Sequence, residues 1–204
     1  MSKHALVSFK GNKQIDREIT LTGSKSECNR ALIISSLSKG TVKVDNMSNA
    51  ADTVTLNSIL NNISQNNPHQ QTVDVGPAGT AMRFLTAMLS TLPGNFLLTG
   101  TERMKQRPIG ILAEALKNIG ADITYLEQDG FPPLDINGPL KQSTDTVKIK
   151  GDISSQYISA LLMIAPTLPQ GLTLQIEGEL TSLPYVKMTL DMLQEAGITH
   201  EWSE

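Results

Sequence analysis

Three stretches of the chain repeat one order of apolar and polar positions. Each begins with a short turn rich in Gly and Ser, continues as a nearly all-apolar helical pattern, and ends in a glycine followed by an alternating strand pattern. The turns occupy residues 23–26, 76–80 and 151–156. Because a helix that is apolar nearly all round is buried, we expect the three helices after these turns to lie at the centre of the fold.

A second, amphipathic helical pattern follows each of these first helices. Asp52 is predicted to cap the first of them, and Pro108 and Pro184 are predicted to open the other two. Gly120 and Gly197 are placed as C-terminal glycines, and strands are expected directly after both. The amphipathic face indicates that these helices lie on the outside.

The pattern therefore predicts an α/β (α+β) fold of three units, at about residues 21–75, 76–150 and 151–204, with the last unit incomplete. Residues 1–20 have no helical pattern and are interpreted as a polar hairpin. Its alternative interpretation is that these residues are simply the first strands of the same domain.

Composition narrows the class of protein. The 204 residues carry a net charge of −3 and a single cysteine, so an internal disulfide is excluded and a slightly acidic chain is a poor candidate for nucleic-acid binding. No apolar run reaches the length of a membrane span, and residues 1–10 lack the apolar segment of a signal peptide. The three histidines are far apart, so no metal site is expected. A cytoplasmic protein is the default expectation.

The three glycine-containing turns are candidates for anion binding. If the units pack around one axis, the N-termini of the buried helices emerge on one face, and each offers unpaired N–H groups and a partial positive charge. Arg103 and Arg107 precede the second helix of the middle unit, where they either add cations to the same rim or form a solvated charge cluster. The turns carry these polar and glycine residues: Lys25, Ser26, Arg30, Gly79, Thr80, Arg83, Ser154, Ser155 and Gln156.

Each of these residues also has a purely structural interpretation. Ser154 and Ser155 are common helix caps, Arg30 is spaced to pair with Glu27 on its own helix, and Cys28 is more typical of a small buried side chain than of a nucleophile. A single turn would favour the structural interpretation. Three equivalent turns, two of them with basic residues, favour binding.

Five motifs resemble the 5-enolpyruvylshikimate-3-phosphate (EPSP) synthase family. They are LTGSKSECNRAL at 21–32, GPAGTAMR at 76–83, LTGTERMKQRPI at 98–109, GDISSQ at 151–156 and SLPY at 182–185. The resemblance implies two similar lobes, each of three β-α-β-α-β-β units, with substrates between them. It also implies a 3-phosphoshikimate 1-carboxyvinyltransferase, which moves the enolpyruvyl group of phosphoenolpyruvate to the 5-hydroxyl of shikimate 3-phosphate and releases phosphate.

The resemblance implies roles for individual residues. Lys25 would touch both ligands and act in catalysis. Shikimate 3-phosphate would be bound by Lys25, Ser26, Arg30, Ser154, Ser155, Gln156, Ser182 and Tyr185. Phosphoenolpyruvate would be bound by Lys25, Gly79, Thr80, Arg83, Arg103 and Gln156. No metal or organic cofactor is implied.

The acid and base carboxylates of the family belong to the second lobe, so the chain is expected to be a half-enzyme, inactive alone, whose C-terminal lobe is absent and whose residues 1–20 belong to that lobe. The full-length enzyme is expected to be a monomer in the cytoplasm, without nucleic-acid or membrane partners. Two alternatives remain open: a non-catalytic anion-binding module, and a relative of the transferase that acts on UDP-N-acetylglucosamine.

Overall fold

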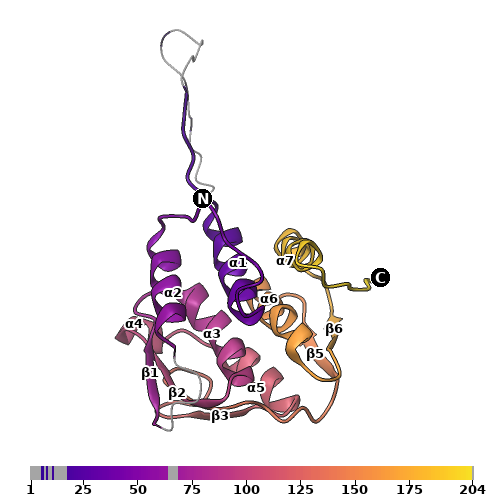
Figure 1. Cartoon of the computed structure of the whole chain (residues 1–204). Helices are drawn as coiled ribbons and strands as arrows, with labels where there is room; N and C mark the ends of the chain where they lie inside the picture. Colours follow the sequence, from indigo (N-terminus) through magenta and orange to yellow (C-terminus); the bar gives the residue numbers. More distant parts are fainter. Residues whose placement is uncertain (1–5, 7, 9–10, 12–17, 64–68, 204) are drawn as a thin grey trace.

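Three buried helices form the centre of the computed structural model, which describes residues 6, 8, 11, 18–63 and 69–203. They are α1 (Lys25–Leu37), α3 (Gly79–Thr91) and α6 (Ser155–Ile164), and they contact one another pairwise (Figure 1). Phe84, Leu85 and Ile158 on these helices have no exposed surface. The prediction that the first helix of each unit is buried is therefore confirmed.

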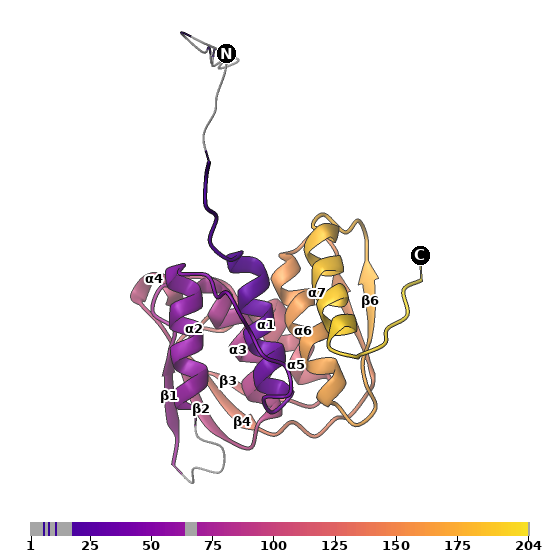
Figure 2. The ribbon, with the colours of Figure 1, turned by 45° about the horizontal axis from the view of Figure 1, so that its top comes forward.

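The second helix of each unit lies outside this centre. These helices are α2 (Ala51–Asn62), α5 (Gly110–Asn118) and α7 (Leu183–Glu195), and Figure 2 shows α1 between α2 and α6, with α7 beside α6. The prediction that Asp52 caps α2 is wrong, because Ala50 holds the N-cap position and Asp52 lies in the first turn. Gly120 and Gly197 both have positive φ after their helices, as the sequence predicts.

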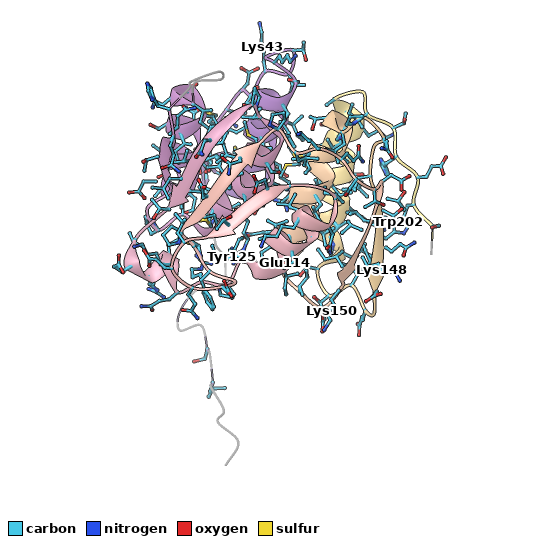
Figure 3. All side chains as sticks on the ribbon, turned by 90° about the horizontal axis from the view of Figure 1, so that it is seen from below. Lys43, Glu114, Tyr125, Lys148, Lys150 and Trp202 are labelled. Carbon is cyan, nitrogen blue, oxygen red and sulfur yellow. The ribbon has the colours of Figure 1, made fainter. Side chains whose placement is uncertain are left out.

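A four-stranded sheet covers one side of the inner helices (Figure 3). Its order is β1 (Gln71–Asp74), β2 (Gly94–Thr99), β4 (Leu134–Gly138) and β3 (Asp122–Tyr125). β1 runs parallel to β2, whereas β4 is antiparallel to both of its neighbours. Residues 71–138 thus form one β-α-β-α-β-β succession, with the short helix α4 (Glu102–Lys105) inserted before α5.

A second sheet has two parallel strands, β5 (Thr146–Lys150) and β6 (Thr173–Glu177), with a 3₁₀ turn at Ala165–Thr167 before β6. β1 and β5 each pair with the strand that follows their inner helix, so each belongs to the sheet of the next unit. The unit boundaries at about residues 75 and 150 stay predictions.

Several strands that the sequence predicts do not form. Residues 198–203 have no regular structure, although the equivalent residues after Gly120 form β3. β3 is paired with β4, and the described residues beside β6 supply no such partner. Residues 18–21 and 41–44 are not strands either, and Ile19 and Leu21 are exposed. Most of the expected hairpin at 1–20 lies outside the described residues. Of the described helices, none is long and apolar enough to cross a membrane.

Candidate anion-binding site

The N-terminal ends of the three inner helices meet at one small pocket. Its volume is about 170 Å³, and its lining comes from α1, α3, α6 and α7. The lining residues are Lys25, Ser26, Asn29, Arg30, Thr80, Ser154, Ser155, Gln156 and Tyr185. No carboxylate is among them, although the chain as a whole is acidic. The convergence expected from the repeated turns is therefore present, and it concentrates helix-end N–H groups and cationic side chains in one place.

The end of α1 brings a lysine and free N–H groups to the pocket. Ser24 is the N-cap, and its hydroxyl accepts a hydrogen bond from the N–H of Glu27 at 3.4 Å. The Lys25 ammonium lies 3.6 Å from Asp52 on α2, and half of its side chain is exposed. An exposed ion pair of this kind is weak, so Lys25 can exchange Asp52 for a ligand anion at small cost.

Arg30 is buried, with 2% of its surface exposed. Its guanidinium donates to the carbonyl of Ser26 at 2.8 Å, to Ser159 Oγ at 2.9 Å and to Thr189 Oγ1 at 2.7 Å. The predicted alternative pairing with Glu27 is wrong, since among the described residues no carboxylate forms an ion pair with Arg30. Burial lowers the pKa of Arg30 to about 10, so the group still carries its charge at neutral pH.

These three bonds fix the position of the Arg30 charge without using all of its donors. Each terminal nitrogen retains an N–H, and the residue lines the pocket. The rings of Phe84 and Tyr185 lie 5.5 and 5.9 Å from the guanidinium carbon. Arg30 thus supplies a positioned positive charge that no protein carboxylate in the described part of the chain neutralises.

A hydrogen-bond network joins α3 to α6 beside the pocket. Arg83 Nη1 donates to the carbonyl of Gly79 at 3.2 Å and to Gln156 Oε1 at 2.8 Å, and Gln156 Nε2 donates to Thr80 Oγ1 at 3.2 Å. The Arg83 guanidinium also lies 5.4 Å from the ring of Tyr157. Three residues from the second and third predicted turns are therefore held in contact, which sequence spacing alone could not establish.

The N-terminal end of α3 is buried beside cationic side chains. No side chain caps this helix, and Ala78 holds its N-cap position. The guanidinium of Arg107 lies directly against Gly79, so closely that a Cβ at residue 79 would overlap it. Desolvation and the nearby charge of Arg83 lower the pKa of Arg107, while Asp52 opposes this shift. Cations crowded at an uncapped helix end form a site for a negatively charged ligand.

For Arg107 the sequence predicted only a position near the rim of the anion-binding face, as an added cation or as part of a solvated charge cluster. Arg103, which the resemblance assigned to phosphoenolpyruvate, lies exposed on α4, and its charge contributes to lowering the pKa of Arg107. Both arginines precede α5 in the same motif, and only the packing of that segment against Gly79 distinguishes them. The role of Arg103 stays a prediction.

The third turn contributes hydroxyls rather than charge. Ser154 caps α6, with its hydroxyl accepting from the N–H of Gln156 at 3.4 Å, and Ser155 is buried at the first helical position. Tyr185 lines the pocket from α7, whereas Ser182 precedes that helix and is not among the lining residues. Cys28 is buried, and its sulfur accepts from the N–H of Ser48, which fits the structural interpretation.

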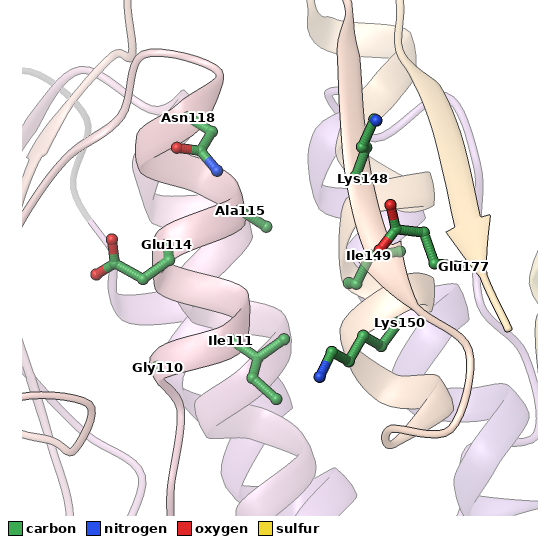
Figure 4. A pocket seen from close by; sticks show the side chains of 9 residues that line it. All are labelled: Gly110, Ile111, Glu114, Ala115, Asn118, Lys148, Ile149, Lys150 and Glu177. Atoms are coloured by element: carbon green, nitrogen blue, oxygen red, sulfur yellow. The ribbon is translucent and has the colours of Figure 1, made fainter.

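A wider depression of about 510 Å³ lies elsewhere, between α5 and β5 (Figure 4). Its lining includes two lysines, Lys148 and Lys150, and two glutamates, Glu114 and Glu177, and Figure 4 shows the Glu114 side chain turned away from β5. Its charges cancel and its polar side chains are largely exposed. It lacks the uncompensated positive charge of the smaller pocket and the convergence of three helix N-termini found there, so the smaller pocket is the candidate site.

Comparison with known proteins shows the family of the chain. The family model for EPSP synthase (3-phosphoshikimate 1-carboxyvinyltransferase) matches residues 9–203. The chain belongs to the EPSP synthase family. A relative from Bacteroides fragilis (strain YCH46), named 3-phosphoshikimate 1-carboxyvinyltransferase, is 47% identical over 190 residues, which are 93% of this chain and 45% of that protein. A protein of the same name from Shewanella sp. (strain ANA-3) is 42% identical and is covered to 48%.

The fold is that of EPSP synthase as well. The structure of EPSP synthase from Acinetobacter baumannii superposes with a TM-score of 0.71 at 21% identity, over 89% of this chain and 45% of that one. The enolpyruvyl-transferase-like lobe predicted from the sequence is thereby confirmed as a fold. The chain spans about half the length of the relatives that it matches.

Proposed function

We propose that this chain binds shikimate 3-phosphate and phosphoenolpyruvate and takes part in 3-phosphoshikimate 1-carboxyvinyltransferase activity. In this reaction the 5-hydroxyl adds to the enol carbon, and phosphate then leaves. The observation that carries the proposal is the pocket at the three helix ends, where Lys25 and Arg30 face a lining without carboxylates. Two polyanionic substrates repel each other, so a site that joins them needs concentrated positive charge.

The geometry supports a division of the site between the two ligands. The hydroxyls and amide of the third turn, with Lys25 and Arg30, suit the phosphate and hydroxyls of shikimate 3-phosphate. The uncapped end of α3, with Gly79, Arg83 and Arg107, suits phosphoenolpyruvate. Lys25 lines the pocket and is the residue of this chain proposed to act in catalysis.

The proton transfers of the reaction need acid and base groups near the enol carbon. Among the described residues, the acid that pairs with Lys25 is Asp52, at 3.6 Å. The resemblance assigns these groups to the second lobe of the family. The proposal therefore requires that lobe for turnover and expects the cytoplasmic setting of a biosynthetic enzyme.

Calorimetric titration with shikimate 3-phosphate tests the binding half of the proposal. We expect saturable binding, and we expect Lys25→Ala to weaken it by roughly 10-fold to 100-fold, because a hydrogen bond to a charged group is lost. Lys148→Ala is the matched control, since it removes a lysine from the wider depression and should leave the affinity unchanged. Absence of binding, or equal losses in both variants, would contradict the proposal.

Mixing this chain with the remaining part of a relative tests the catalytic half of the proposal. The part of the Bacteroides fragilis relative beyond its matched region would be expressed separately and added to this chain, with both substrates present. Release of phosphate only in the mixture is the expected result. A non-catalytic anion-binding module would bind shikimate 3-phosphate and release no phosphate in that mixture.

A further inference from the structure

Asn29 lies at the point where the pocket meets the hydrophobic core. It follows Lys25 by one helical turn on the face of α1 that lines the pocket, and none of its surface is exposed. Ile33, one turn further along the same face, is also fully buried and belongs to the core. Along this face the side chains change from charged to apolar, and Asn29 is a polar group in a position that packing alone would fill with an apolar one.

The amide of Asn29 makes no hydrogen bond to the part of the chain that the structure describes. Neither Nδ2 nor Oδ1 has a hydrogen-bond partner among the described residues. Burial of an amide without partners destabilises a fold, and leucine has nearly the same size and no such cost. A fold optimised only for stability would not keep an asparagine here.

The polar groups around Asn29 are by contrast held by the protein. Gln156 bonds to both Thr80 and Arg83, and Arg30 makes three hydrogen bonds to α1, α6 and α7. Those groups are fixed in place before any ligand arrives. Asn29 is therefore a buried lining residue whose amide makes no hydrogen bond to the described residues.

The chemistry of an amide decides which part of a ligand it suits. A phosphate or carboxylate oxygen only accepts, so it would pair with Nδ2 and leave Oδ1 facing negative charge. A hydroxyl both donates and accepts, so hydroxyl groups can satisfy Oδ1 and Nδ2 together. Lys25 and Arg30 already supply the cations that an anionic group needs.

We propose that Asn29 binds a hydroxyl of the ligand and so selects a phosphorylated polyol acid over a bare phosphate. The inference rests on the proposed function, which supplies shikimate 3-phosphate as that polyol. It makes Asn29 a specificity-determining residue of the site, distinct from the cations that hold the phosphate. Replacement of Asn29 should change the selectivity between ligands more than the affinity for anions in general.

Asn29→Leu tests this directly by titration with shikimate 3-phosphate and, separately, with inorganic phosphate. We expect the affinity for shikimate 3-phosphate to fall by about tenfold or more and the affinity for inorganic phosphate to change by less than about twofold. The melting temperature should stay equal or rise, because an unpaired buried amide is removed. A gain in stability with a selective loss of binding is a result that a merely structural asparagine would not give.

Thr53→Val is the matched control. Thr53 on α2 is 1% exposed and its hydroxyl also lacks a partner among the described residues, but it does not line the pocket. This variant should be at least as stable as the parent and should keep its affinity for shikimate 3-phosphate. An independent readout is the side-chain NH₂ signal of Asn29 in ¹⁵N spectra, which should shift on addition of shikimate 3-phosphate. The signal of Asn95, which donates to Asn137 at 2.7 Å, should not move.

The outcomes separate the two proposals. If the parent binds shikimate 3-phosphate and Lys25→Ala weakens it while Asn29→Leu does not, the proposed function stands and the role of Asn29 is overturned. If Asn29→Leu lowers the melting temperature and weakens both ligands equally, its role is structural and the inference is again overturned. If the parent chain binds no shikimate 3-phosphate, the proposed function and this inference both fail.

Discussion

The second and third units share the order of strand, inner helix, strand and outer helix, but they bury their strands to different degrees. In the second unit all of β1, β2, β3 and β4 form, and Phe96 and Leu98 on β2 have no exposed surface. In the third unit, as far as the described residues go, β6 pairs with β5 alone, and Leu174 and Ile176 are partly buried. The comparison teaches that an alternating pattern becomes a well-buried strand only where neighbouring strands and helices cover it.

The same two units also contribute different chemical groups to the site. The second unit supplies Arg83 and Arg107 at an uncapped helix end, whereas in the third unit Ser154 caps the helix and Ser155 and Gln156 supply uncharged groups. In the proposed function, the first helix end suits a small, highly charged anion and the second suits an anion with hydroxyls.

The largest expected effect tests the difference in burial. Leu98→Ala should destabilise the protein by about 2–5 kcal/mol, because it leaves a cavity where a fully buried side chain packed. The equivalent change in the third unit, Leu174→Ala, should cost about 1 kcal/mol, since that side chain is already partly exposed. Urea unfolding of both variants measures the difference. Equal losses would show that β6 is as well covered as β2.

The next effect tests the division of chemistry. Gly79→Ala should weaken phosphoenolpyruvate binding by about tenfold or more, because the new methyl group displaces the Arg107 guanidinium. Folding should change by less than about 1 kcal/mol, since the displaced group is the flexible end of a side chain and alanine favours a helix. Ligand-observed NMR with phosphoenolpyruvate, in the presence of shikimate 3-phosphate, and thermal unfolding give the two values.

A pair of arginine variants controls for charge alone. Arg107→Gln and Arg103→Gln each remove one positive charge near the same helix end. If position matters, Arg107→Gln should match Gly79→Ala, and Arg103→Gln should have the smaller effect. Equal effects would support the role in phosphoenolpyruvate binding that the resemblance assigned to Arg103.

The smallest effect concerns a contact in the second unit that joins its outer helix to its outer strand. The hydroxyl of Tyr125 on β3 donates to Glu114 on α5 at 2.9 Å, and Lys117 lies 3.0 Å from the same carboxylate. Tyr125→Phe should cost less than about 1 kcal/mol at neutral pH, because the pair is exposed. No ion pair forms among the described residues of the third unit.

This contact has a defined pH dependence. The Lys117 hydrogen bond is the main cause that lowers the pKa of Glu114 below its ordinary value of 4.5. The stabilisation is therefore fully present above that value and is lost as the pH falls through the lower folded pKa. Unfolding measured at pH 7 and in acid should show the Tyr125→Phe penalty shrinking in acid. A constant penalty would mean that the ring, and not the carboxylate contact, carries the effect.

Much of the site could be predicted because its residues lie in local motifs. Lys25, Ser26, Thr80 and Ser155 stand in turns whose glycines and helical patterns are visible in the sequence, and the structure brings them to one pocket. The choice between Arg103 and Arg107 could not be predicted, because both lie in one motif and only the packing against Gly79 separates them.

A role for Asn29 could not be predicted from the sequence, for a related reason. It lies inside the first motif, and nothing in the sequence shows that its amide is buried without partners. That property depends on α3, α6 and α7, which surround the pocket from distant parts of the chain.

The sequence by itself determined the helices, their buried or amphipathic character and the turns before them, because these follow from residue periodicity and local hydrogen bonding. The tertiary structure decided which strand patterns became strands, as the contrast between β3 and residues 198–203 shows. It also decided that Arg30 bonds to α6 and α7 rather than to Glu27. Strand pairing and the burial of a charge depend on partners far along the chain, and those partners are set only when the units pack together.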